Sequence, residues 1–291
     1  MYELIRLSEH DYYIDCPAKI GLVTDGDGCV TAIDSGNDKD AGKKVLRHIE
    51  ANGWKLTAVF NTHSHADHIG GNRFLQERTG CRIYAPGMEA VYTNHPELEP
   101  MTLYGGLPFK DLKGKFMMAQ SSHAEVLTKD VLPEGMEILE LPGHSFDMAG
   151  FRTPDGNVFL ADCLCSEETR AKYGIGYLWY PVKYMETLEK VKNMTAGRFI
   201  PAHAPVCGDI SGLAQKNIDA VRELLDRILK LCGAPRTFEE ILQGLFTEYG
   251  MTMTIQQYAL IGSTVRSCLS ALYTEGKITF TCEDGFVRCH S

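Results

Sequence analysis

Short apolar runs alternate with amphipathic segments along the chain, a pattern typical of a protein built from both strands and helices. Residues 56–62 are short, apolar and rich in β-branched side chains, which predicts a buried strand. Residues 69–79 predict a helix that ends at Gly80. Further apolar runs predict strands at 137–141, 157–161 and 198–200.

The last eighty residues follow a different pattern. A long amphipathic helix is predicted at 212–232, and Gly233-Ala234-Pro235 then interrupts the chain. Two helices, at 238–249 and 254–275, and a hairpin at 276–288 with an acidic turn are predicted after this break. We therefore expect a larger domain at residues 1–232 and a smaller one at 233–291.

Four metal-binding side chains lie within six residues, directly after the strand predicted at 56–62. They are His63, His65, Asp67 and His68. If the chain leaves the strand in an extended form, the first two histidines project to one side, and the last two residues turn into the helix start. Two ligand pairs would then face two neighbouring metal ions. Imidazole and carboxylate ligands suit zinc, iron or manganese. A polar turn that is rich in histidine by chance is the alternative.

Three later strand ends also carry a histidine or an aspartate. His144 follows the strand at 137–141, Asp162 follows the strand at 157–161, and His203 follows the strand at 198–200. Each alone would be an ordinary hydrogen-bonded side chain. Together with the first cluster they predict a shared site, because the ends of several strands meet easily at one edge of a sheet.

At these residues the sequence resembles the metallo-β-lactamase superfamily, in its glyoxalase II-like branch. The matching motifs stand in the family's order at 32–36 (AIDSG), 62–68 (THSHADH), 142–145 (PGHS), 160–162 (LAD) and 201–203 (PAH), and the resemblance covers about residues 18–230. It implies an α/β fold, the four-layered αββα sandwich, with the site at one edge. The C-terminal order of helix, helix and hairpin resembles a winged helix, a small α+β module.

The resemblance also implies which residues bind metal. One metal would be held by His63, His65 and His144, and the other by Asp67, His68 and His203, with Asp162 bridging the two. Two divalent ions are expected, with zinc favoured over iron or manganese. A hydroxide between them would attack a small thioester, ester or lactone, and Asp67 would orient that hydroxide as the catalytic residue.

Two segments are candidates for contacting a small-molecule substrate. Residues 87–134 are interpreted as a lid-like insertion with Tyr104 and Phe109 as apolar wall residues, although packing on the sheet is an equal alternative. The aromatic run around Trp179 and Tyr180 is expected near the pocket mouth, where Lys183 would hold a substrate carboxylate.

Composition narrows the partners and the compartment. The formal net charge is −9, from 29 basic and 38 acidic residues, which argues against broad binding to nucleic acid or to anionic membranes. The chain shows no apolar run long enough to cross a membrane and no basic, apolar leader, and its ten cysteines fit a reducing compartment. We therefore expect a soluble, cytoplasmic protein.

Two other functions stay open. A persulfide dioxygenase uses a subset of the same ligands with one iron. A winged-helix protein that binds nucleic acid, or a ribonuclease that uses this module, is the second alternative. From residue 231 onward, however, the chain has only four basic residues against six acidic ones. For this small domain we therefore favour a packing role or a homodimer interface.

Overall fold

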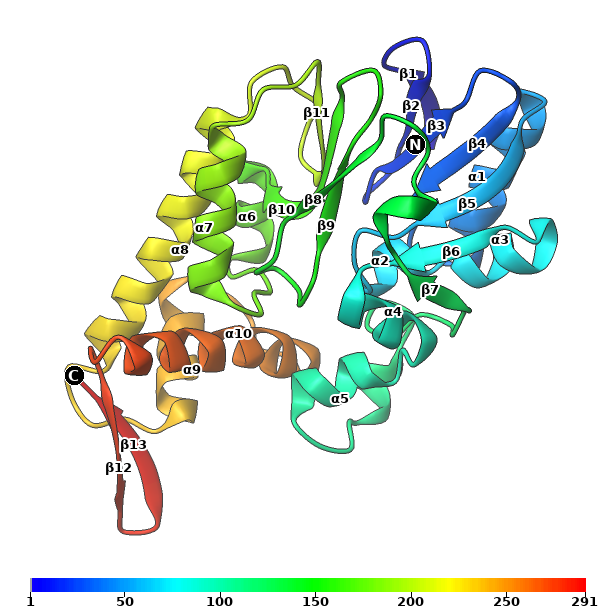
Figure 1. Cartoon of the computed structure of the whole chain (residues 1–291). Helices are drawn as coiled ribbons and strands as arrows, with labels where there is room; N and C mark the ends of the chain where they lie inside the picture. Colours follow the sequence, from blue (N-terminus) through cyan, green and yellow to red (C-terminus); the bar gives the residue numbers. More distant parts are fainter. Residues whose placement is uncertain (1) are drawn as a thin grey trace.

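The computed structural model describes residues 2–291, in which two main β-sheets face each other (Figure 1). The larger sheet has seven strands, and their order in the sheet is their order in the chain. Strands β1 to β4 pair antiparallel, and β4 to β7 pair parallel. The seven strands are β1 (Glu3–Arg6), β2 (Asp11–Asp15), β3 (Ile20–Thr24), β4 (Cys29–Ile33), β5 (Lys55–Phe60), β6 (Arg82–Ala85) and β7 (Ala124–Val126).

The smaller sheet has four strands in the order β11, β10, β9, β8. Strands β8, β9 and β10 are antiparallel neighbours, and β11 lies parallel to β10. The three strands predicted after residue 136 are all present, although β10 continues well beyond its predicted end. The four strands are β8 (Glu137–Glu140), β9 (Ala149–Arg152), β10 (Val158–Cys165) and β11 (Phe199–His203).

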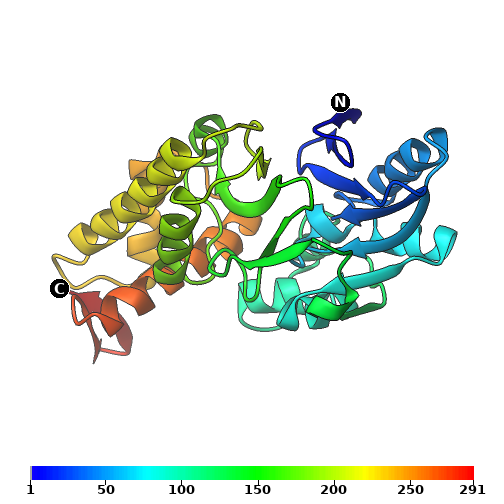
Figure 2. The same cartoon turned by 45° about the horizontal axis from the view of Figure 1, so that its top comes forward.

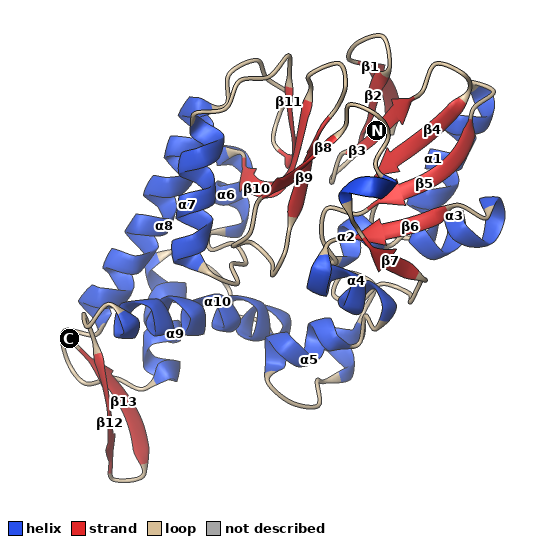
Figure 3. Cartoon of the chain, viewed as in Figure 1, coloured by secondary structure: helices blue, strands red, loops and turns tan. Residues whose placement is uncertain are grey.

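Helices cover the outer faces of both sheets (Figure 3). On the larger sheet these are α1 (Lys39–Ala51) and α3 (Asn72–Thr79), and on the smaller sheet α7 (Pro181–Lys192) and α8 (Ser211–Leu231), with α6 (Glu167–Tyr173) beside α8. Apolar side chains fill the space between the sheets, where the rings of Phe60 and Phe151 stack 5.8 Å apart. The expected αββα sandwich is confirmed, and Figure 2 shows α1 and α8 on opposite sides of it.

The helix predicted at 69–79 is wrong in one respect, because the structure divides it. Helix α2 (Ala66–Ile69) begins inside the histidine cluster, and α3 starts only at Asn72. Between them, Gly70 and Gly71 pass against neighbouring backbone. A Cβ atom would lie 2.3 Å from the carbonyl carbon of Asn37 at the first position, and 2.3 Å from the carbonyl oxygen of Ser35 at the second. This tertiary contact leaves no room for a side chain at either position.

The segment 87–134 is only partly an insertion outside the sheet. Helix α4 (Gly87–Asn94) packs on β6 and β7, and β7 itself extends the larger sheet. Helix α5 (Leu98–Tyr104) and the 3₁₀ helix η1 (Lys110–Lys113) instead pack against a helix of the C-terminal segment. A second 3₁₀ helix, η2 (Lys129–Val131), leads to the smaller sheet.

The C-terminal segment contains the elements expected from the sequence, with ends that differ from the predicted ones by at most three residues. Helix α9 (Phe238–Glu248) starts with a capping box and is followed by α10 (Ile255–Thr274). The hairpin of β12 (Thr279–Glu283) and β13 (Phe286–His290) projects away from the body (Figure 1). The winged-helix assignment stays a prediction. The domain boundary after residue 232 also stays one, since α8 contributes to the apolar core of both parts.

The longest helices are α8, with 21 residues, and α10, with 20. In the part of the chain that the structure describes, no helix combines the length and the apolar character needed to cross a membrane.

Candidate metal centre

Seven histidine and aspartate side chains gather at one edge of the sandwich. They come from four regions that are distant in the sequence, and the ends of the two sheets bring them together. The loop after β5 carries His63 and His65, helix α2 carries Asp67 and His68, the loop after β8 carries His144, β10 carries Asp162, and β11 ends with His203.

The seven side chains form two groups that share one member. The first group is His63, His65, His144 and Asp162, and the second is Asp67, His68, Asp162 and His203. Within each group, the candidate ligand atoms lie within 4.8 Å of one another. These are the two sets, with a common aspartate, that the family resemblance implies.

The chemistry of these groups fits a cation better than a network of hydrogen bonds. In the first group, Nδ1 of His65 lies 3.0 Å from Nε2 of His63 and 3.0 Å from Nε2 of His144, so three ring nitrogens converge on one point. In the second group, the buried Nε2 of His68 and Oδ1 of Asp162 lie 3.1 Å apart, yet neither atom has a well-formed hydrogen bond. Buried polar atoms normally have partners, and a divalent ion would provide one here.

The electrostatics of the two groups differ. In the first, burial lowers the pKa of His65 to about 4 and that of His144 to about 3, and it holds the pKa of His63 well below the usual value. The neutral imidazole is the form that binds metal. In the second, burial opposes the charged form of His203, but the carboxylates of Asp162 and Asp67 raise its pKa to about 10. Two carboxylates beside one imidazole favour positive charge at this point, which a bound cation would supply.

Neighbouring acceptors hold three of the histidines in one orientation. Asp34 accepts hydrogen bonds from the backbone and the hydroxyl of Thr62, both at 2.8 Å, and its Oδ2 lies 2.7 Å from Nδ1 of His68. The Thr62 hydroxyl lies 3.0 Å from Nδ1 of His63, and the carbonyl oxygen of Pro17 lies 2.9 Å from Nδ1 of His203. Each contact directs Nε2 of its histidine toward the groups of ligands.

Glu89 on α4 is a supporting residue that the sequence analysis missed. Its side chain is fully buried and accepts four hydrogen bonds. Oε2 accepts from the backbone and the hydroxyl of Ser64, and Oε1 accepts from the hydroxyl of Ser145 and the backbone of Asp147. This one carboxylate therefore connects the loop of His63 and His65 to the loop of His144. No local sequence signal marks it.

Two further residues border the first group and were not predicted. Oε1 of Glu99 on α5 lies 3.5 Å from Nε2 of His65, and burial raises the pKa of Glu99 to about 8. The ring of Tyr177 lies edge-on, 5.2 Å from the ring of His65 and 5.8 Å from that of His144. The sequence analysis placed an aromatic cluster at this point of the chain, but it singled out the two residues that follow Leu178.

The loop that carries His144 makes close contact with the aromatic segment. The carbonyl oxygen of Gly143 accepts hydrogen bonds from the backbone of Trp179 and of Tyr180. Gly143 has φ of 125°, and a Cβ atom there would lie 2.4 Å from the backbone of Tyr184, so only glycine fits. The segment is therefore held next to His144.

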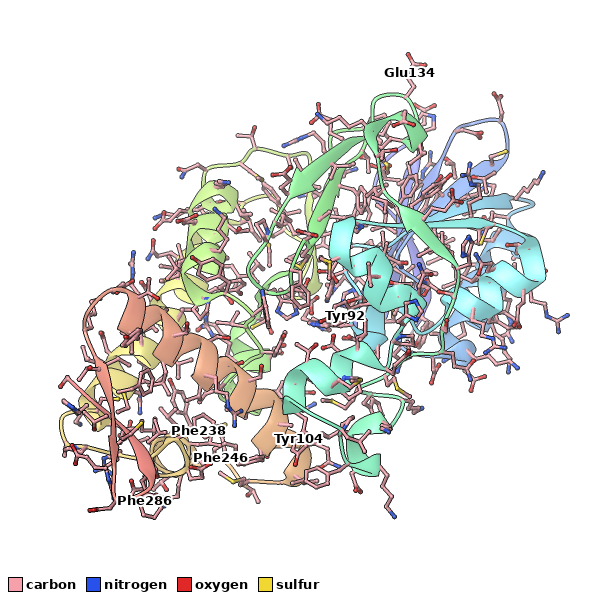
Figure 4. All side chains as sticks on the ribbon, turned by 60° about the horizontal axis from the view of Figure 1, so that its bottom comes forward. Tyr92, Tyr104, Glu134, Phe238, Phe246 and Phe286 are labelled. Atoms are coloured by element: carbon pink, nitrogen blue, oxygen red, sulfur yellow. The ribbon has the colours of Figure 1, made fainter. Side chains whose placement is uncertain are left out.

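Only some of the predicted substrate residues lie near the clustered histidines and aspartates. Trp179 packs on Phe146 with ring centres 4.3 Å apart, close to His144. Tyr104 packs on Phe109, with ring centres 4.8 Å apart. Figure 4 shows Tyr104 beside the first turns of α10, and no contact joins it to the ligands among the described residues. Nζ of Lys183 lies 2.9 Å from Oε2 of Glu186, so an internal ion pair already engages it. Tyr180 is half exposed.

Comparison with known proteins gives the same picture at the level of the family. The metallo-beta-lactamase superfamily profile matches residues 13–203, which is more than half of the chain and includes all seven clustered side chains.

Curated relatives match over shorter stretches. A hydroxyacylglutathione hydrolase of Rhodopseudomonas palustris (strain BisB18) is 31% identical over 149 residues, which is 50% of this chain and 47% of the relative. A second, from Bradyrhizobium sp. (strain ORS 278), is 31% identical over 123 residues, or 42% of this chain and 39% of the relative. The matches therefore span less than half of each relative.

Solved structures share the fold over nearly the whole chain. A metallo-beta-lactamase family protein from Thermus thermophilus has a TM-score of 0.73 at 19% identity and covers 98% of this chain and 99% of its own. A beta-lactamase domain protein from Burkholderia ambifaria has a TM-score of 0.71 at 16% identity, with 99% and 93% covered. With the family match over the ligand-bearing core, this chain belongs to the metallo-beta-lactamase superfamily.

Proposed function

We propose that this protein is a metal-dependent hydrolase that cleaves a small thioester, ester or lactone. The observation that carries the proposal is the pair of histidine and aspartate groups that share Asp162 at the edge of the sandwich. Curated relatives named hydroxyacylglutathione hydrolase favour a thioester as the first class of substrate to test.

The residues that would hold two divalent ions are those of the two groups. We propose zinc as the metal. Iron and manganese are the alternatives, because imidazole nitrogen and carboxylate oxygen suit all three metals. Two such ions supply Lewis acidity and bring the pKa of a bound water down toward neutral pH.

Asp67 is the proposed catalytic residue within the second group. Its Oδ2 lies 3.3 Å from Nε2 of His203, and its side chain is 42% exposed, in contrast to the fully buried His68. The carboxylate therefore lies at the open side of the groups. There it can accept a hydrogen bond from the attacking water and orient its lone pair toward the substrate carbonyl carbon.

The substrate space is proposed to lie over the first group. Tyr177 and Trp179 form its nearest aromatic wall, with Tyr180 toward the solvent. Tyr104 and Phe109 belong to the outer rim under this proposal. Lys183 is the weakest of the proposed substrate contacts, since Glu186 would have to release it first.

The C-terminal segment is proposed to support the site rather than to bind nucleic acid. Helix α10 packs against α5 and α7, and it carries Thr264, which accepts a hydrogen bond from the backbone of Leu178. A homodimer through this segment and a cytoplasmic location stay predictions, and sedimentation of the purified protein tests the first of them.

An assay of three substrate types tests the function. The native protein, loaded with zinc, iron or manganese, should hydrolyse at least one of a glutathione thioester, an aryl ester and a lactone, and a chelator should abolish this activity. The variant His144→Ala should lose it, and His95→Ala, whose side chain is 64% exposed and lies outside both groups, should keep it. Oxygen consumption that depends on a thiol and one iron per chain would support a dioxygenase instead.

A further inference from the structure

Glu99 lies beside the first group without belonging to it. It is the second residue of α5, in the segment 87–134, far in sequence from every member of the group. Its side chain is only 14% exposed, and Oε1 lies 3.5 Å from Nε2 of His65. An acidic side chain buried beside a histidine calls for an explanation, because burial without a partner is costly for a carboxyl group.

The position of His65 shows which of its nitrogens faces the group. Its Nδ1 lies 3.0 Å from Nε2 of both His63 and His144, so this nitrogen points to the common centre. A ring that offers the Nδ1 lone pair to a cation must carry its proton on Nε2. Oε1 of Glu99 lies 3.5 Å from that nitrogen.

Three of the other four histidines show what such a partner does. Thr62 holds Nδ1 of His63, Asp34 holds Nδ1 of His68, and the Pro17 carbonyl holds Nδ1 of His203. His65 uses the opposite nitrogen, so its partner has to lie on the other side of the ring. Between residues 2 and 291, Glu99 is the only acidic side chain recorded next to Nε2 of His65.

We propose that Glu99 is a positioning residue for the first group: its carboxyl group accepts the Nε2 hydrogen of His65 and holds the ring with Nδ1 toward His63 and His144. The inference rests on the proposed metal binding and extends it to a residue outside the two groups.

The inference also gives the C-terminal segment a part in the site. Helix α5 lies outside the larger sheet and packs against α10 (Figure 1). Helix α10 therefore helps to fix the position of Glu99 beside His65. The same helix holds the aromatic wall. The hydroxyl of Thr264 accepts from the backbone of Leu178 and donates to the carbonyl oxygen of Gly176, on either side of Tyr177.

Metal binding by three variants tests the proposal. Affinities are measured by competition with a chromophoric chelator, with zinc or cobalt as the only added ligand, and the cobalt form also gives an absorption spectrum of the site. The variants are Glu99→Ala, Glu99→Gln and, as the matched control, Glu97→Ala, whose side chain is 59% exposed just before α5.

The native protein is expected to bind two equivalents. Glu99→Ala should bind one of them about 10–100-fold more weakly and show an altered cobalt spectrum, which is the usual effect of removing a partner of a metal-bound histidine. Glu99→Gln keeps a neutral acceptor and should fall between the two, and Glu97→Ala should match the native protein.

Native affinities and a native spectrum in either Glu99 variant would overturn the proposal, as would an equal loss in the Glu97 control. The Gln variant preserves the shape of the side chain and carries the test if the Ala variant does not fold. If the native protein itself binds no metal, the proposed function fails together with the inference. If only the inference is wrong, every variant binds two equivalents of metal with native affinity.

Discussion

The variant Glu89→Gln should destabilise the protein strongly, because Glu89 is a buried carboxylate with four donors and no basic partner among the described residues. Each oxygen accepts from two donors at 2.7–3.0 Å. The amide of glutamine keeps one oxygen and turns the other into an NH₂ group, so one pair of donors would face another donor.

The magnitude follows from the two lost bonds. Hydrogen bonds to a charged group contribute about 1.5–3 kcal/mol each, and two of them amount to about 3–6 kcal/mol. The glutamine side chain is cheaper to bury than a carboxylate, which offsets part of the loss. We therefore expect the free energy of unfolding to fall by about 2–4 kcal/mol.

Urea unfolding of the metal-free protein measures this change, with Glu134→Gln as the control. Glu134 projects into solvent (Figure 4), so its substitution should leave the free energy of unfolding within about 0.5 kcal/mol of the native value. The reasoning would be refuted if the two variants were equally stable. Metal affinity should also fall only in Glu89→Gln, since Glu89 connects the two loops that carry the first group.

Three other predictions concern the surroundings of the site. Replacing Thr264 by valine leaves the Leu178 amide without its acceptor and should lower the free energy of unfolding by about 1–3 kcal/mol, whereas Thr274→Val, on the exposed end of α10, should change it little in the same urea titration. Replacing Asp34 by alanine removes the acceptor for Nδ1 of His68 and should weaken metal binding about 10–100-fold, measured by chelator competition. The metal-free protein should lose stability as the pH falls from about 6.5 toward 4. The three imidazoles of the first group have lower pKa values in the folded protein than in the unfolded chain, so the unfolded chain binds more protons in this range. The raised pKa of Glu99 has the opposite effect on stability, but it involves one proton against three. A melting temperature that stays constant or rises as the pH falls over this range would contradict the assignment of neutral imidazoles.

The sequence predicts the seven clustered side chains well because they are dense and recur at strand ends. His63, His65, Asp67 and His68 lie within six residues, and the other three each interrupt an apolar strand. The four-layered sandwich, in contrast, is implied by the resemblance to the family and not by the alternation of apolar strands and amphipathic helices. Local patterning is therefore enough to locate the seven side chains at one edge, whereas their division into two groups follows from the resemblance to the family.

The supporting residues depend on contacts between distant segments, which local patterning does not record. Glu89 and Glu99 lie in a polar segment without a motif, and each becomes visible only when α4 and α5 reach the loops that carry the ligands. The division between α2 and α3 has the same origin, because Gly70 and Gly71 read as an ordinary helix start until the backbone of Ser35 and Asn37 is placed beside them.

The metal content of the native protein tests the central claim most directly. Elemental analysis is made on protein purified without a nickel column and then on the variant Asp162→Ala, since Asp162 is the one residue common to both groups. We predict about two divalent ions per chain in the native protein, zinc above all, and a clear loss from the variant. A native protein that binds no metal when zinc, iron and manganese are each supplied, or a variant that keeps both ions, would contradict the account.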